Sequence, residues 1–221
     1  MSNRKKPEIY APHIPAGVIE TRRLRELVDI LERSGSKEIK LTGELIFVLG
    51  ADSLNEETRG ALPFAASRYE IPGVRGIKVC SATTFCDRNH KDVLSLARKL
   101  DELYYGLELP MKLTVGLSGC VRSCSEPATK DIGVMAQPQG YKILIGGSAG
   151  MNPSIGKEFA TLKTDDEVIR LVDRVVAFCK AHGRKMVRLG RLIEEKGEDF
   201  FREFLEDPQN REDAKSAEGA L

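Results

Sequence analysis

The sequence predicts a fold of the α+β class, and three observations lead to this prediction. Short strand-like segments alternate with amphipathic helical segments along most of the 221 residues. Apolar residues between Thr164 and Gly183 recur at helical spacing and form one stripe. The segment Gln137–Gly140 has a turn composition and lies between two strand-like segments, which is typical of a hairpin. With 41% hydrophobic and 30% charged residues, the chain has a globular composition, which argues against general disorder.

The first seventy or so residues predict a β-α-β-α order. Residues 1–8 read as a disordered basic lead, and the helix that follows has Leu24, Leu27 and Leu31 on one face. The expected elements are an extended Tyr10–Ile19, a helix Thr21–Ser34, a strand Glu38–Leu49, a largely helical Ser53–Tyr69 around Pro63, and a strand Val74–Val79. This order resembles half of a ferredoxin-like sandwich, so we expect a ferredoxin-like half-domain over residues 9–74.

The remaining residues predict a second α+β domain over 75–206, which closes with helices. We expect a helix Arg88–Tyr105, a strand Lys112–Leu117, hairpin strands Asp131–Ala136 and Tyr141–Ile145, and helices at 164–182, 187–196 and 198–206. The last residues, 207–221, contain few apolar side chains and read as a polar tail.

Charge and hydropathy argue against two classes of partner. Lys and Arg number 34 against 33 Asp and Glu, a balance that does not favour a nucleic-acid binder held by charge alone. The longest apolar stretch, Leu45–Ala51, has seven residues and contains a glycine, so no membrane span is expected. Prolines interrupt the basic N-terminus before any apolar segment, so it does not read as a signal peptide. The chain is therefore expected in the cytoplasm.

Five cysteines in a reducing compartment do not predict a disulfide framework. Cys179 continues the apolar helical stripe and reads as a core residue. The other four form two pairs, C-x5-C at Cys80 and Cys86 and C-x3-C at Cys120 and Cys124. Four thiolates from two loops suit either zinc or an iron–sulfur cluster, and spacing alone leaves both open.

The surroundings of the pairs favour an anionic centre. Each pair is expected between a strand and a helix, where free backbone N–H groups stabilise thiolate charge, and Cys120 and Cys124 are expected to share one helical turn. Gly119 removes a Cβ where the chain approaches something bulky. The side-chain-poor segment that starts at Gly146 and Gly147 could turn N–H groups toward an anionic ligand. Cations gather near these loops in the sequence, at Arg75, Lys78, Arg88, Lys91, Lys112, Arg122 and Lys130.

With these residues in view, the chain resembles the nitrite/sulfite reductase family, whose members hold a sirohaem beside a 4Fe–4S cluster. The resemblance is carried by C-x5-C and by LSGCVRSCSEPATKDIGV, Leu117 to Val134, and it extends over about residues 10–205. The α+β unit that larger sulfite reductases carry twice is present once here. The length is similar to that of the small, single-copy class called assimilatory-type or low-molecular-weight sulfite reductases.

The resemblance implies a role for each motif. It implies that Cys80, Cys86, Cys120 and Cys124 bind the cluster, and that Cys124 also bridges to the sirohaem iron. It implies that Arg75 and Lys112 hold the substrate anion and supply protons. Arg122, Lys130, Gly146 and Gly147 are assigned to the sirohaem carboxylates.

The expected activity is the six-electron reduction of sulfite to sulfide. The alternative activity is the reduction of nitrite to ammonia. Two further alternatives are a non-catalytic sirohaem–cluster electron-transfer protein or subunit, and a zinc-binding interaction module. Electrons are expected from an external donor protein, and the sequence leaves open whether two chains pair as a homodimer. The family's strand Arg is missing, because no Arg or Lys lies between Leu41 and Arg59, and Thr114 replaces the second lysine of a K-x-K pattern.

Overall fold

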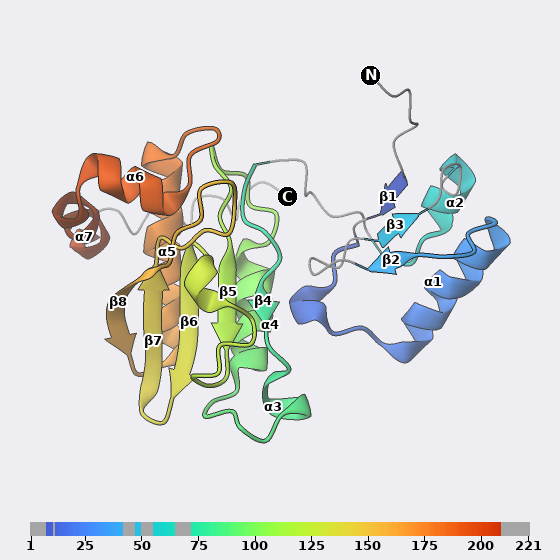
Figure 1. The fold of residues 1–221 in the computed structure, drawn as a ribbon, viewed down its shortest axis with the longest axis horizontal. Coiled ribbons are helices and arrows are strands. Elements are labelled where there is room, and N and C mark those ends of the chain that lie inside the picture. Colours follow the sequence, from blue (N-terminus) through green and yellow to red (C-terminus); the bar gives the residue numbers. More distant parts are fainter. Residues whose placement is uncertain (1–7, 11, 42–46, 50–54, 65–71, 209–221) are drawn as a thin grey trace. The chain divides into compact units, whose positions relative to one another are not determined.

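The computed structural model describes residues 8–10, 12–41, 47–49, 55–64 and 72–208. By its internal contacts the chain divides into two compact units, Met1–Tyr69 and Glu70–Leu221. The expected domain boundary at residues 74 and 75 falls slightly inside the second unit. The expected basic lead and polar tail lie almost entirely outside the described residues. Each unit is an α and β structure, in agreement with the predicted α+β class (Figure 1).

The first unit has the order β-α-β-β-α among its described elements. These are β1 (Glu8–Tyr10), η1 (Pro15–Gly17), α1 (Thr21–Arg33), β2 (Lys40–Leu41), β3 (Phe47–Leu49) and α2 (Glu56–Ala61). The sheet order is β1-β3-β2, and both outer strands run antiparallel to β3. β1 and β2 are therefore parallel to each other with β3 inserted between them, which is the split β-α-β arrangement of ferredoxin-like folds.

The helix expected at 21–34 is confirmed, and its buried face contributes Leu27 and Leu31 to a small core with Tyr10. The single strand expected over Glu38–Leu49 is wrong, because β2 and β3 pair antiparallel as two strands. The largely helical segment expected over Ser53–Tyr69 is described only at residues 55–64, where the helix α2 ends before Leu62. Leu62 has ψ 135°, the extended conformation that a following proline favours.

The second unit is built on a sheet of the order β4-β5-β6-β7-β8 within the part of the chain that the structure describes. Its strands are β4 (Lys78–Val79), β5 (Val115–Ser118), β6 (Ile132–Gln137), β7 (Gly140–Ile145) and β8 (Lys157–Leu162). β4, β5 and β6 are parallel, whereas β7 and β8 are antiparallel to their neighbours. The predicted hairpin is confirmed as β6 and β7, and β8 was not expected.

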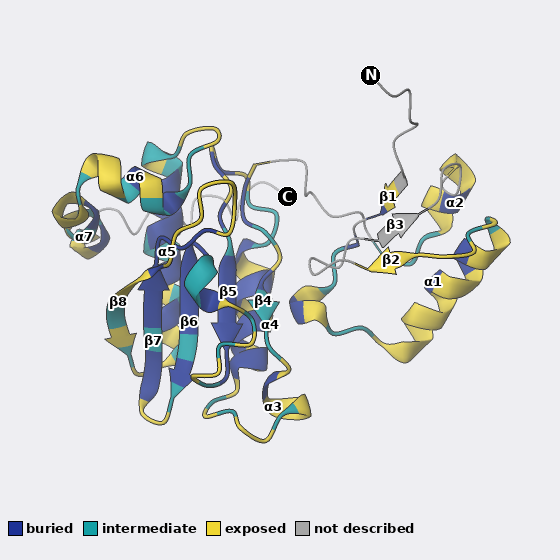
Figure 2. Ribbon diagram, viewed as in Figure 1, coloured by how far each residue is buried: buried dark blue, intermediate teal, exposed yellow. Residues whose placement is uncertain are grey.

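Helices cover one face of this sheet, as Figure 1 shows for α4 (Val93–Tyr104) and α5 (Asp165–His182). The core lies between them and the sheet, where the middle strands are buried (Figure 2). Cys179 is 0% exposed in α5, so its predicted core position is confirmed, and burial raises the pKa of its thiol. α4 begins at Val93, later than expected, because the Asp92 side chain caps it by accepting from the Ser95 N–H.

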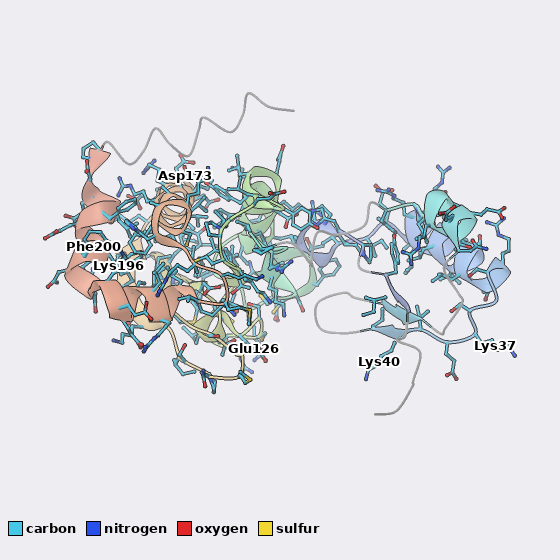
Figure 3. All side chains as sticks on the ribbon, turned by 90° about the horizontal axis from the view of Figure 1, so that it is seen from above. Lys37, Lys40, Glu126, Asp173, Lys196 and Phe200 are labelled. Atoms are coloured by element: carbon cyan, nitrogen blue, oxygen red, sulfur yellow. The ribbon has the colours of Figure 1, made fainter. Side chains whose placement is uncertain are left out.

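Two closing helices, α6 (Leu189–Lys196) and α7 (Glu198–Glu206), confirm the helices expected at 187–196 and 198–206. Aromatic rings attach α7 to α5, and a cation–π contact joins α6 to α7. The ring centroids of Phe178 and Phe201 are 4.8 Å apart, and Lys196 Nζ lies 5.8 Å from the Phe200 ring centroid (Figure 3). Within the described residues, no helix is both long and apolar enough to cross a membrane.

Candidate functional site

The two cysteine pairs follow neighbouring parallel strands at the same end of the sheet. Cys80 comes directly after β4, and Cys120 comes two residues after β5. The register pairs Val79 with Leu117, so the carboxyl ends of β4 and β5 lie side by side. In Figure 1 this end of the sheet lies beside α3 (Ala82–Phe85), the short helix between Cys80 and Cys86. Ligand sites commonly form at such carboxyl ends of parallel strands.

Hydrogen bonds join the first cysteine loop, which contains Cys80 and Cys86, to the end of β5. The Gly119 N–H donates to Cys80 Sγ over 3.3 Å, and the Cys80 N–H donates to the Leu117 carbonyl over 3.2 Å. The His90 N–H donates to the Gly119 carbonyl over 2.7 Å. A Cβ on Gly119 would lie 2.8 Å from Asn89 Cβ, so this glycine permits a close approach of the two loops.

The second cysteine loop, Cys120–Glu126, is not helical. The four-residue spacing of Cys120 and Cys124 predicts a helical turn, and this prediction is wrong. Tight turns connect Cys120 to Glu126, with the Ser123 N–H donating to the Cys120 carbonyl over 3.3 Å. Ser123 and Glu126 have φ values of 58° and 54°, in the left-handed region that non-glycine residues seldom adopt. The helical interpretation fails here because these two residues redirect the chain on either side of Cys124.

All four cysteines of the pairs are free thiols. Cys80, Cys86 and Cys120 are half-buried, and Cys124 is exposed. Among the described residues, no three His, Cys, Asp or Glu side chains are arranged to hold a metal ion. The donor set itself fits a 4Fe–4S cluster, because four thiols on two hydrogen-bonded loops are the ligands that such clusters require. The backbone N–H donated to Cys80 Sγ is also a typical contact of cluster sulfur.

Arg75 and Lys112 lie together, but at the other end of β4 and β5. The Arg75 N–H donates to the carbonyl of Leu113, the neighbour of Lys112, over 3.0 Å. Both residues precede their strands, whereas the cysteines follow them. Lys112 is exposed and precedes Cys120 by up to roughly 26 Å of extended chain. Arg122, in contrast, lies between Cys120 and Cys124 and is exposed.

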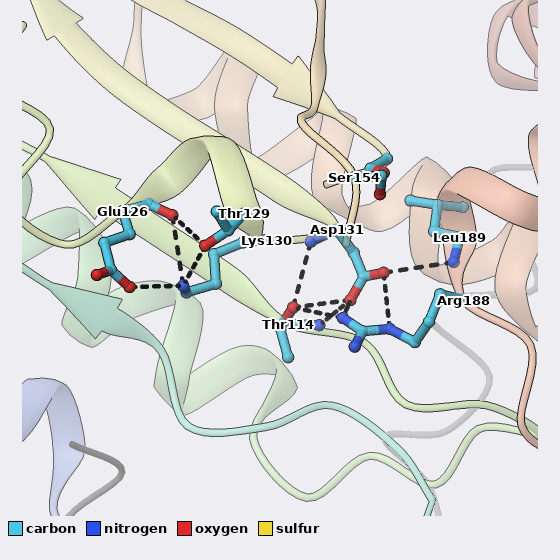
Figure 4. A network of polar contacts seen from close by, with 9 residues as sticks. Thr114, Glu126, Thr129, Lys130, Asp131, Ser154, Arg188 and Leu189 are labelled. Carbon is cyan, nitrogen blue, oxygen red and sulfur yellow. Dashed lines mark hydrogen bonds and ion pairs between the residues drawn. The ribbon is translucent and has the colours of Figure 1, made fainter. Parts of the chain in front are cut away.

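Lys130 is buried, with 6% of its surface exposed. Its Nζ donates to the Thr129 hydroxyl over 2.9 Å and to the Glu126 carbonyl over 3.3 Å, and the Glu126 carboxylate is 3.7 Å away (Figure 4). A Cβ on Gly116 would lie 2.8 Å from Lys130 Cγ, so the stem of the lysine crosses β5. The ammonium is therefore held toward the segment that follows Cys124.

Gly146 and Gly147 follow β7 at the end of the sheet opposite the cysteines. The Gly146 N–H donates to the Asp131 carbonyl over 2.9 Å, so this donor is already used within the protein. A Cβ on Gly147 would lie 2.2 Å from the Ala128 carbonyl oxygen, which explains why this position needs a glycine. Gly146 also lines a pocket of about 150 Å³, together with residues of β8, α6 and α7. The expected contact of both glycines with a cofactor stays a prediction.

A buried ion pair beside Lys130 was not foreseen from the sequence. Asp131 is 0% exposed and accepts hydrogen bonds from Arg188 Nε over 3.2 Å and Nη2 over 2.5 Å (Figure 4). It also accepts from the Thr114 N–H and hydroxyl over 2.8 and 2.7 Å. Thr114, at the place of the missing second lysine, is thus engaged with Asp131. No sequence signal could reveal a pair whose members are 57 residues apart.

Comparisons with known proteins agree with this arrangement. Residues 70–212 match the family described as the nitrite and sulphite reductase 4Fe-4S domain. A protein of Bacillus subtilis named nitrite reductase (NAD(P)H) is 24% identical over 222 residues, which cover 96% of this chain and 27% of the relative. A protein of Nitratidesulfovibrio vulgaris named sulfite reductase, assimilatory-type, is 28% identical over 132 residues, covering 60% of this chain and 61% of the relative.

Two solved structures share the fold. The Mycobacterium tuberculosis NirA protein matches with a TM-score of 0.69 and 24% identity, over 88% of this chain and 39% of that one. The structure described as dissimilatory sulfite reductase I matches with a TM-score of 0.72 and 14% identity, over 91% of this chain and 69% of that one. The chain spans about a quarter of the Bacillus subtilis relative and less than two thirds of the Nitratidesulfovibrio vulgaris relative.

Proposed function

Because the chain belongs to the nitrite and sulphite reductase 4Fe-4S domain family, we propose that it reduces sulfite to sulfide at a sirohaem bridged to a 4Fe–4S cluster. The observation that supports this most directly is the joining of two cysteine loops by the Gly119 N–H to Cys80 Sγ hydrogen bond. Cys80, Cys86, Cys120 and Cys124 would hold the cluster, and Cys124 would also be the bridge to the sirohaem. Together the two groups would supply single electrons to the bound substrate.

The chain's own residues would bind the anion and handle its protons. Reduction of sulfite to sulfide consumes six electrons and six protons and releases three water molecules. Cations that hold the oxyanion and donate protons to its departing oxygens lower the barrier to each S–O cleavage. We assign this role to Arg75 and Lys112, which stand before β4 and β5 while the cysteines follow these strands, so the substrate would be held from that end. Arg122 and Lys130 would pair with the sirohaem carboxylates, and Arg122 is favoured for this by its exposed position between two cluster ligands. Gly146 and Gly147 would contact the cofactor from the opposite end of the sheet.

Nitrite reduction to ammonia is the second candidate, because the nitrite reductase relative matches 96% of this chain. Sulfite is preferred because the chain covers 61% of the sulfite reductase relative against 27% of the nitrite reductase relative. In both cases we propose that a separate donor protein supplies the electrons. We also propose a reducing compartment such as the cytoplasm, because an odd number of cysteines does not favour a disulfide framework.

The test is an assay of the purified, reconstituted protein with a reduced viologen dye. We expect iron, acid-labile sulfide and a tetrapyrrole in one sample, and dye oxidation on addition of sulfite with sulfide as the product. Dye oxidation with nitrite alone, and ammonia as the product, would select the second candidate. Cofactors without either turnover would identify an electron-transfer subunit, and zinc in place of iron would overturn the proposal.

A further inference from the structure

Two serines attach the second cysteine loop to the end of β5. The Ser125 hydroxyl donates to the Leu117 carbonyl, and the Ser125 N–H donates to Ser118 Oγ over 3.3 Å. The two hydroxyl oxygens are 2.6 Å apart. Since the single Ser125 proton points at Leu117, the Ser118 hydroxyl donates to Ser125 Oγ. Both hydroxyl groups therefore donate a hydrogen bond within the protein, and Ser118 is only 1% exposed.

These contacts fix the residue directly after Cys124. On the other side of Cys124 the chain passes through Ser123, with a left-handed φ of 58°, and it turns again at Glu126, with φ 54°. Left-handed backbone in non-glycine residues persists only where surrounding contacts enforce it. Cys124 itself is exposed, so the packing of its own side chain does not position it. The Ser125 residue, directly after Cys124, joins the loop to the strand through its hydroxyl and its N–H.

The same end of β5 also holds the first cysteine loop. The residue after Ser118 is Gly119, whose N–H donates to Cys80 Sγ. Leu117 accepts from both loops, through the Cys80 N–H and through the Ser125 hydroxyl. Both cysteine loops are thus hydrogen-bonded to the segment Leu117–Gly119, which sets the spacing between Cys80 and Cys124.

We infer that Ser118 and Ser125 are positioning residues that hold Cys124 in the conformation that binds iron. The inference rests on the proposed cluster and adds residues outside its ligand set. A cluster tolerates little change in the spacing of its four sulfurs, and loss of polar partners behind metal ligands typically lowers metal affinity about 10- to 100-fold. The serines act through the backbone of the loop and do not touch the cluster themselves.

The experiment compares Ser125→Ala and Ser118→Ala with the wild-type chain after full-length protein is reconstituted with iron and sulfide. We expect each alanine variant to release iron to a chelator about 10-fold faster or more, and to show an altered electron paramagnetic resonance signal of the reduced cluster. Ser125→Thr keeps the hydroxyl and should restore the wild-type release rate. Ser34→Ala is the matched control, because the Ser34 hydroxyl also donates to a backbone carbonyl, that of Leu31.

Melting of the apo chains separates positioning from general stability. Ser118→Ala leaves the Ser125–Leu117 contact in place, so the result is judged on the alanine variant whose melting temperature is nearer to that of the wild type. Wild-type iron release in that variant overturns the inference and leaves the proposed cluster intact. Faster release in Ser34→Ala as well would show a merely structural effect and also overturn it. A wild-type chain that binds no iron overturns both the inference and the proposed function.

Discussion

At the scale of single residues, the Asp131–Arg188 pair joins a fully buried carboxylate to a partly exposed guanidinium. Asp131 is 0% exposed, and the Arg188 side chain is 27% exposed. A buried carboxylate is tolerable only because Arg188, Thr114 and Leu189 together donate to both of its oxygens. Removing Arg188 leaves the carboxylate of Asp131 buried without its charged partner, whereas Arg188 keeps partial contact with solvent.

We therefore expect Arg188→Met to lower the free energy of unfolding by about 3 kcal/mol, because it leaves the buried Asp131 carboxylate without its charged partner. Urea denaturation of the apo chain measures this change. The control is Glu198→Gln, which breaks an exposed pair with Arg202 and should cost about 0.5 kcal/mol or less. If the two substitutions lowered the free energy of unfolding equally, the buried pair would not have the larger contribution that we expect.

Cys124 is the residue on which the proposed electronic coupling depends. Cys124→Ser should abolish the bridge, so the reconstituted variant should lose the wild-type optical spectrum of the coupled centre and most of its turnover. Cys179→Ala serves as the control, since Cys179 lies in the core of α5 and should leave the spectrum unchanged. A Cys124→Ser protein with wild-type spectrum and rate would remove this cysteine from the ligand set.

Lys112 tests the predicted substrate contacts. Its exposed position before β5 leaves room for a ligand, but it stands at the other end of the strand from Cys120. If Lys112 holds the anion, Lys112→Ala should reduce sulfite turnover about 10-fold or more at unchanged iron and tetrapyrrole content. Exposed Lys99 of α4 offers the control Lys99→Ala. Unchanged turnover in Lys112→Ala would place the substrate elsewhere.

At the scale of elements, Asp92 links the first cysteine loop to α4. Its carboxylate accepts from the Ser95 hydroxyl over 2.7 Å, from the Ser95 N–H over 3.2 Å and from the Thr83 hydroxyl of α3 over 3.1 Å. The hydrogen bonds from the Ser95 side chain and backbone lower the pKa of Asp92. The charged form is therefore favoured by folding.

Asp92→Ala should lower the free energy of unfolding by about 1 kcal/mol at neutral pH, the usual cost of losing a helix cap. A lowered folded-state pKa adds stability above the unfolded value of 3.8, and that stability is lost as the pH falls through the folded-state pKa. The difference between wild type and variant should thus shrink below about pH 4. Asp166→Ala, an exposed first-turn acid of α5, should cost only about 0.3 kcal/mol. A difference independent of pH would contradict the capping role.

Periodic elements were predictable, and elements without periodicity were not. The helices α1, α5, α6 and α7 and the β6–β7 hairpin follow from local spacing and turn composition. The loop Cys120–Glu126 does not, because its path depends on contacts of Ser125 with β5. No residue of β8 is fully buried, because its residues are either exposed or half-buried, so the strand lacks a recognisable apolar pattern.

At the scale of the whole molecule, all four predicted cluster ligands and the contacts that join their loops lie in the second unit. A fragment of residues 70–221 should therefore fold and take up iron and acid-labile sulfide in the same ratio per chain as the full protein. Iron and sulfide analysis after reconstitution, with circular dichroism to establish folding, measures this. A folded fragment that binds no iron would show that the first unit contributes to the cluster site.

The sequence by itself determined the α+β class, the helical stripe with its core cysteine and the two cysteine pairs, because each of these is written in residue types over short spacings. Tertiary structure alone decided which of the predicted site residues share an end of the sheet. The parallel register of β4 and β5 brings the cysteine loops together and carries Arg75 and Lys112 to the opposite end. Such pairings join residues that are far apart in the chain, so no local pattern encodes them.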